Sequence, residues 1–108
     1  MQKLVESFIA TANAFDVEGA LSLFAPDAVI DDVSVGEAFV GCDGVRQYLE
    51  RFFVGYNTSS KLLSMKELDT FHSSVRLDFT GDFGHEIGIL KIAINAAGLI
   101  ERIDADLE

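Results

Sequence analysis

The stretch from Leu21 to Phe53 constrains the fold more than any other part of this sequence. It joins the end of an amphipathic helix, a proline, a short strand-type run ending at Asp31 and Asp32, a glycine-bounded loop and another amphipathic helix. Proline cannot continue a helix, and side chains alternate along a strand. We therefore expect a strand between two helices, with Asp31 and Asp32 on opposite faces, so that one carboxylate can line a cavity while the other meets water.

The first half of the chain is predicted to be mainly helical, because apolar residues recur there at helical spacing and acidic residues stand at capping positions. The first expected helix carries Leu4, Val5, Phe8, Ile9 and Ala12, and a short second helix, capped by Asp16, carries Val17, Leu21 and Phe24. A strand from Ala28 to Asp32 and an extended piece from Gly36 to Gly41 are expected to follow. The last expected helix is capped by Asp43 and carries Val45, Tyr48, Leu49, Phe52 and Phe53. Pro26 and Asp27 are expected to end the short helix.

The second half has the alternation of β-strands. The expected strands run near Leu62 to Leu68, then from Thr70 to Phe79, Glu86 to Asn95 and Leu99 to Leu107. The turns Thr80 to Gly84 and Asn95 to Gly98 are typical of antiparallel hairpins. Helices followed by a meander predict an α+β fold with helices on one face of a curved antiparallel sheet.

Alternation also predicts which side chains face the helices. The inward set is Phe71, Ser73, Val75, Leu77 and Phe79 in the second strand and Leu99, Ile103, Ala105 and Leu107 in the last. The third strand is apolar on both faces, with Leu90, Ile92 and Ile94 on one and Ile87, Ile89 and Ala93 on the other. A strand that is apolar on both faces is usually covered on both. We therefore expect a homodimer through the outer sheet face, where His72, Arg76, Lys91 and Arg102 also lie.

The length of 108 residues fits a single domain over residues 1–108. Eighteen acidic and eight basic residues give a net charge of −10, which disfavours binding to nucleic acids or anionic membranes. No apolar run approaches the roughly 20 residues of a membrane span, and no basic segment precedes an apolar one at the N-terminus. We expect a cytoplasmic location.

Other chemical motifs are absent or weak. No HExxH, paired cysteines, P-loop or GxGxxG pattern occurs, so neither a metal nor a cofactor is expected. Cys42 lies beside Asp43, which opposes thiolate formation, and it is interpreted as a small residue beside a helix start. His72 is expected on the outer face. His85 and Glu86 follow a turn and are interpreted as turn residues, with a role at the rim of a pocket as the alternative.

Three segments together resemble the NTF2-like superfamily, and within it the SnoaL-like and ketosteroid-isomerase-like proteins. They read LFAPDAVIDD, GCDGVRQYLERFF and NAAGLIERIDAD. The resemblance implies a cone-shaped, cystatin-like fold whose curved sheet and helices enclose a pocket, commonly in a homodimer. It does not imply one activity, since the superfamily includes isomerases, cyclases, epoxide hydrolases, dehydratases and binding proteins.

The resemblance implies particular site residues. Asp32 falls where steroid isomerases hold the carboxylate that moves a proton between carbons. The two oxyanion donors of those enzymes correspond to Phe8 and Leu90 here, and neither side chain can donate a hydrogen bond. The resemblance therefore argues against ketosteroid isomerisation. The Asp-Arg-Asp site of epoxide hydrolases is matched only by the spacing of Arg76 and Asp78. Both point outward by the alternation, and Ala105 stands where the second acid is expected.

We therefore expect a pocket protein in which Asp32 is the general base of an isomerase or lyase-type step on a small hydrophobic substrate. The expected pocket residues are Phe8, Phe24, Phe52, Phe71, Val75, Leu90, Ile92 and Ile103. The alternative is a non-catalytic dimeric module that binds a small apolar ligand or serves as a scaffold. Nine phenylalanines are enough to fill the cone outright, so both an open and a plugged pocket are compatible with the sequence.

Overall fold

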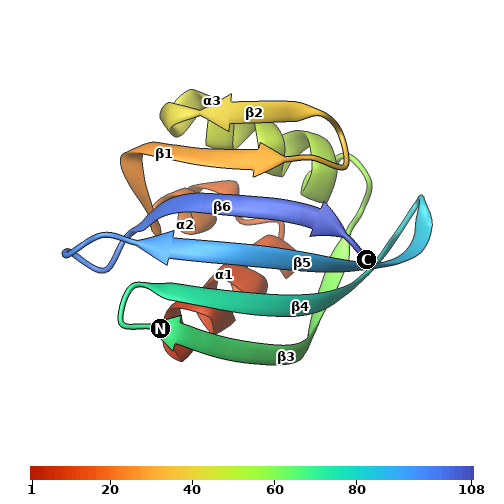
Figure 1. Ribbon diagram of the computed structural model, residues 1–108. Helices are drawn as coiled ribbons and strands as arrows, with labels where there is room; N and C mark the ends of the chain where they lie inside the picture. The colour runs from red at the N-terminus through yellow and green to blue at the C-terminus, as the bar shows by residue number, and fades with distance from the viewer.

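The helices lie on one face of a six-stranded sheet, as Figure 1 shows. The structure is a computed structural model that describes residues 1–108. Its helical segments are α1 (Gln2–Asn13), α2 (Val17–Leu21), α3 (Gly41–Tyr48) and the π-helical segment η1 (Leu49–Val54), which continues α3 directly. Its strands are β1 (Phe24–Asp32), β2 (Glu37–Val40), β3 (Ser59–Asp69), β4 (His72–Gly81), β5 (Gly84–Ile94) and β6 (Ile100–Leu107).

The strand order in the sheet is β2-β1-β6-β5-β4-β3. Every neighbouring pair is antiparallel except β1 and β6, which pair in parallel. The fold class is α+β, as expected, but the expectation of a wholly antiparallel sheet is wrong at this one pair. The chain leaves β1 through β2 and α3 and returns through the β3–β4–β5 meander, so β6 reaches β1 running in the same direction.

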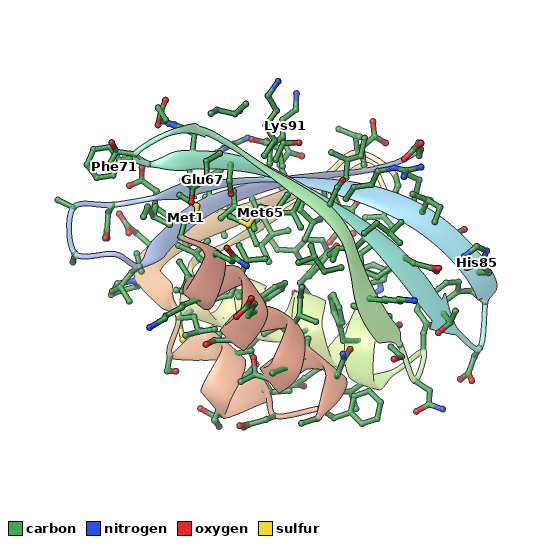
Figure 2. The ribbon with its side chains drawn as sticks, turned by 90° about the horizontal axis from the view of Figure 1, so that it is seen from below. Met1, Met65, Glu67, Phe71, His85 and Lys91 are labelled. Atoms are coloured by element: carbon green, nitrogen blue, oxygen red, sulfur yellow. The ribbon has the colours of Figure 1, made fainter.

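The space between helices and sheet holds one hydrophobic core. Its members include Val5 and Phe8 from α1, Val45 from α3, and Ile92 and Ile103 from the sheet, all at most 2% exposed. Figure 2 shows Met1 and Met65 on the helix side of the sheet and Lys91 on the opposite face, which no helix covers. None of the helices combines the length and apolar character that crossing a bilayer would require.

Two expectations about β1 and the preceding helix are wrong. The short helix ends at Leu21, and Phe24 begins β1 instead of closing that helix. Pro26 lies inside β1, where the register with β6 shifts between Phe24 and Val29. A strand tolerates proline at such an irregularity because no ladder hydrogen bond is needed from its nitrogen. Asp16 does cap α2, since its side chain accepts a hydrogen bond from the Gly19 N–H at 2.9 Å.

The third helix differs from expectation at both ends. It begins at Gly41, before the expected cap Asp43, which lies in the first turn and can still interact favourably with the helix dipole. From Leu49 the helix widens into η1, where the Gly55 N–H donates to the Glu50 carbonyl five residues back at 2.8 Å. Widened turns of this kind often occur at functional sites.

Alternation fails at two places in the sheet. Phe71, expected inward, is 44% exposed in the turn between β3 and β4, where its N–H donates to the Asp69 side chain at 2.8 Å. In β6 the register shifts beside Ile94, so Ile100 and not Leu99 enters the core. A bulge inserts one residue and reverses the alternation, which periodicity alone cannot anticipate.

Candidate functional site

A cavity of about 360 Å³ opens between η1 and the ends of β1, β4, β5 and β6. The pocket is therefore open, and the plugged alternative is wrong. Its lining is mostly apolar and aromatic with a few polar groups and consists of Asp32, Ser34, Val35, Tyr48, Phe52, Phe53, Tyr56, Thr58, Phe79, Phe83, Glu86, Leu90, Ala105, Asp106 and Leu107. Ligand sites commonly have this composition.

Asp32 is the last residue of β1 and points to the cavity, with 6% of its surface exposed. Its Oδ2 accepts a hydrogen bond from the Tyr48 hydroxyl at 2.6 Å. Its Oδ1 accepts two bonds from Ser34, one from the backbone N–H at 3.0 Å and one from the hydroxyl at 2.5 Å. Asp31 lies on the other face, half-buried and 3.2 Å from Arg102, so the predicted division of the two acids is confirmed.

Tyr48 is the residue that joins helix α3 to this carboxylate. Burial, followed by the negative charge of Asp32 and the hydrogen bond to it, raises the pKa of Tyr48 well above its ordinary value. The hydroxyl therefore stays protonated at neutral pH and acts as a donor to Asp32. A charge-assisted bond of this kind fixes the position of the carboxylate at the cavity wall.

Aromatic side chains from α3, η1 and the following turn form one wall of the cavity. Ring centroids lie 5.0 Å apart between Tyr48 and Phe52, 6.0 Å between Phe52 and Tyr56, and 6.1 Å between Tyr56 and Phe83. Residues at i, i+4 and i+8 drift by roughly 40° per step around an α-helix of 3.6 residues per turn. The wider turns of η1 reduce that drift and keep Tyr48, Phe52 and Tyr56 on one face.

The charge of the lining is entirely negative. Asp32 and Glu86 turn their carboxylates to the cavity, whereas the Asp106 side chain lies on the outer sheet face, and no Lys, Arg or His is among the lining residues. Beyond Asp32 and its partners, Thr58 uses its hydroxyl to donate to the Phe52 carbonyl at 2.6 Å. Tyr56 is the one lining hydroxyl whose oxygen bonds no protein group. Because the charged residues of the lining are all acidic, anionic ligands are disfavoured.

The structure brings together only part of the pocket set expected from the sequence. Asp32, Phe52 and Leu90 line the cavity. The other apolar members, apart from Phe71, belong to the hydrophobic core and are not among the lining residues: Phe8, Phe24, Val75, Ile92 and Ile103. Phe71 lies exposed in its turn. For Ile92 and Ile103 the reason is that an inward-facing position shows which face a side chain is on but not how far along the strand the cavity lies.

Several lining residues were not expected from the sequence, although some carried a signal. Tyr48, Phe52 and Tyr56 are spaced four apart, which indicates one aromatic face on a helix. A serine two residues after Asp32 is typical of a side chain that bonds the backbone ahead of it. Glu86 lines the cavity, whereas His85 lies outside that lining, with Nε2 2.6 Å from Asp78 on the outer face.

The other candidate groups lie away from the cavity. Arg76 points outward and pairs with Glu108 at 2.6 Å, so Arg76 and Asp78 form no Asp-Arg-Asp site with the cavity. His72 is exposed and its Nδ1 lies 2.8 Å from Asp69. Cys42 is a free, exposed thiol. No group of three or more His, Cys, Asp or Glu side chains is arranged to hold a metal ion.

Comparison with known families assigns the chain. The family model described as "SnoaL-like domain" matches residues 5–84, more than half of the sequence. The chain belongs to the SnoaL-like domain family. This confirms the resemblance found in the sequence. No protein of curated function matches this SnoaL-like domain significantly.

Solved structures with the same fold include a ligand-bound protein, an enzyme and a protein of unknown function. A Mycobacterium tuberculosis protein in complex with estradiol-17β-hemisuccinate aligns with a TM-score of 0.85 and 21% identity over 96% of this chain and 90% of its own. The epoxide hydrolase/cyclase-like enzyme SalBIII, with a role in pyran ring formation in salinomycin, aligns with a TM-score of 0.86 and 16% identity over 99% and 89%. A Methylobium petroleophilum protein of unknown function with a cystatin-like fold gives 0.86 and 18% over 99% and 74%. At these identities the likeness shows the fold alone.

Proposed function

We propose that this SnoaL-like domain is an isomerase or lyase-type enzyme that moves a proton on a small hydrophobic substrate, with Asp32 as general base. The observation that carries the proposal is the placement of Asp32, a carboxylate that is 6% exposed and lines an otherwise mostly apolar cavity. Water competes little for a base in such a site, which makes proton abstraction from a bound substrate effective.

The hydrogen bonds of Asp32 leave room for this role. A carboxylate has about four lone-pair positions, and Tyr48 and Ser34 supply three donors. One position remains for a substrate C–H. In the proposed step Asp32 takes that proton, and the C–H electron pair moves into the substrate. The carboxylic acid then returns the proton to a second carbon, or transfers it to a departing group in a lyase-type step. Tyr48 and Ser34 act as positioning residues because they hold the carboxylate in one orientation.

A second candidate function is a non-catalytic module that binds a small apolar ligand. The observation that favours it is that the two positions expected to supply oxyanion donors carry none. Phe8 lies in the core, and Leu90 offers no hydrogen bond. One oxyanion donor typically contributes about 100-fold to 1000-fold in rate, so proton abstraction from a neutral carbonyl compound would be slow in this cavity.

Deuterium incorporation separates the two candidates. Compounds retained by the purified protein, identified by native mass spectrometry, together with a panel of small ketones, enones and imines, are incubated in D₂O and followed by NMR. Wild type should exchange a C–H of one compound, and Asp32→Asn should lose about 100-fold to 10,000-fold in that rate. Asp31→Asn, a matched change on the opposite face, should retain the wild-type rate. A compound that binds without exchange would favour the binding module.

We also propose that two copies pair through the outer sheet face. Ile87, Ile89 and Ala93 are half-buried there although no helix covers this face. Arg76, Lys91 and Arg102 gather on the same face of an otherwise acidic chain, where Asp104 of a second copy offers an opposite charge.

Sedimentation velocity tests the proposed dimer. Wild type should sediment as a dimer, and Ile89→Glu should shift it to monomer because a charge would be buried in the interface. Val54→Glu, the same kind of change at an exposed position on η1, is the control and should remain dimeric. A wild-type monomer at high micromolar concentration would contradict the proposal.

A further inference from the structure

The cavity combines carboxylates with aromatic rings and contains no basic side chain. Three acidic residues and six aromatic residues are among its fifteen lining residues. All eight Lys and Arg residues of the chain, and both His residues, lie elsewhere. An apolar ligand accounts for the rings, but it leaves the inward carboxylates of Asp32 and Glu86 unexplained.

Neither of the two carboxylates that face the cavity, Asp32 and Glu86, has a cationic partner. The ion pairs of the protein use other acids: Asp31, Asp69, Asp78, Asp104, Glu18, Glu37, Glu67 and Glu108. Asp32 is the most telling case because it is 6% exposed and bonds only hydroxyls and an N–H. A buried charge is normally paired with an opposite charge, so the protein leaves a position for one.

The aromatic wall suits the same kind of ligand. The faces of aromatic rings attract cations, and the attraction grows when water is excluded. The one cation beside this wall is Arg51, whose guanidinium carbon lies 4.9 Å from the centroid of the Phe52 ring. Arg51 is half-exposed and pairs with Glu37, so it neutralises no cavity carboxylate. The other rings of the wall carry no such contact.

We propose that the ligand of this cavity is a small organic cation, an amine or iminium whose positive nitrogen lies beside Asp32 and whose apolar body contacts the rings. This inference rests on the proposed function, for which it names the substrate class. The exposed Glu86, on the inner sheet face beside Phe79, would attract such a ligand, and the net charge of −10 would speed its arrival.

A cationic substrate also removes the need for oxyanion donors. When Asp32 takes a proton from the carbon next to an iminium, the C–H pair forms a C=C bond and the C=N π pair moves to nitrogen. The products are a neutral enamine and a protonated Asp32, which returns the proton to another carbon. No negative charge develops on the substrate. A cavity with a buried carboxylate and no basic side chain is suited to that reaction.

The test uses benzyltrimethylammonium and neopentylbenzene, two probes of the same shape of which only the first is charged. Tyr48 and Tyr56 are the only tyrosines, both line the cavity, and the chain has no tryptophan, so tyrosine fluorescence reports binding directly. The cation should bind wild type about tenfold more tightly than its neutral counterpart. Asp32→Asn should remove most of that preference and Glu86→Gln part of it.

Glu101→Gln is the matched control, because it removes an exposed carboxylate from β6 outside the cavity lining. It should keep the wild-type preference. Glu86 is exposed, so Glu86→Gln should fold and can test the inference even if Asp32→Asn does not fold. Equal or tighter binding of neopentylbenzene, or no binding of the cation at millimolar concentration, would overturn the inference. Binding can be measured without turnover, so the two proposals can fail separately. A preference for the cation without deuterium exchange would contradict only the proposed catalysis. Deuterium exchange without a preference for the cation would contradict only this inference.

Discussion

The two ends of the space between helices and sheet are filled differently, although β4, β5 and β6 run through both. At the end where the Ser73 hydroxyl contacts Met1, the inward residues Ile92 and Ile103 are 2% exposed and belong to the core. At the other end, Phe79 and Leu107 from the same strand faces line a cavity of about 360 Å³. We call these the closed end and the cavity end.

The difference depends on side-chain size more than on pattern. The inward residue of β6 at the cavity end is Ala105, whereas the next inward residue toward the closed end is the larger Ile103. On β5, Gly88 has no side chain, and a Cβ there would lie 2.4 Å from the Phe79 ring. The Phe79 ring therefore occupies the place of a side chain at Gly88, whereas the small side chain of Ala105 leaves open space in the cavity. One alternating pattern can thus produce either a packed core or a binding site.

The largest expected effect compares the two ends on one strand. Ile103→Ala should lower the free energy of unfolding by about 2 to 5 kcal/mol, because it opens a void in the packed closed end. Leu107→Ala, at a position that is 40% exposed at the cavity end, should lower it by about 1 kcal/mol or less. Urea unfolding of both variants measures the contrast. Equal losses would show that the two ends are packed alike.

A smaller effect concerns the bond between helix and carboxylate. Tyr48→Phe removes the donor to Asp32 and should cost about 1.5 to 3 kcal/mol at neutral pH, the range for a hydrogen bond to a charged group. Because the pKa of Tyr48 is raised in the folded state, the unfolded state loses the Tyr48 proton first, as the pH rises past the ordinary pKa of 10.0. The stabilisation is therefore complete below about pH 10 and declines above it by up to roughly 1.4 kcal/mol per pH unit.

Urea unfolding from pH 8 to 11 measures this pH dependence. The gap between wild type and Tyr48→Phe should be constant up to about pH 10 and narrow above it. Tyr56→Phe, which removes a hydroxyl that bonds no protein atom, is the control and should keep the alkaline decline. A gap that stays unchanged to pH 11 would contradict the role assigned to Tyr48.

Much of the fold could be predicted from the sequence because periodicity reports burial directly. The helices around Phe8 and Val45 and the inward face of β4 follow from spacing alone. The failures lie where a tertiary contact overrides the local pattern. Examples are the bulge that turns Ile100 inward, the Asp69 turn that exposes Phe71, and the parallel pairing of β1 with β6.

The site was less predictable. Alternation placed Asp31 and Asp32 on opposite faces, and that is confirmed by their surroundings. It could not locate the cavity along the strands, so core residues such as Ile92 and Ile103 were taken for pocket residues. The Tyr48 bond to Asp32 joins positions sixteen apart in sequence, and only the packing of α3 against β1 brings them together.

If the cavity end is left empty for a ligand, filling it should abolish ligand binding without loss of stability. Ala105→Leu adds bulk at the cavity wall, whereas Ala28→Leu adds the same bulk in the core, where Ala28 is 0% exposed. By urea unfolding, Ala105→Leu should be as stable as wild type or more so, and it should lose benzyltrimethylammonium binding. Ala28→Leu should lose about 1 to 3 kcal/mol through overpacking. If Ala105→Leu is destabilised as much as Ala28→Leu, or if it still binds the cation like wild type, the cavity end is not an empty ligand site.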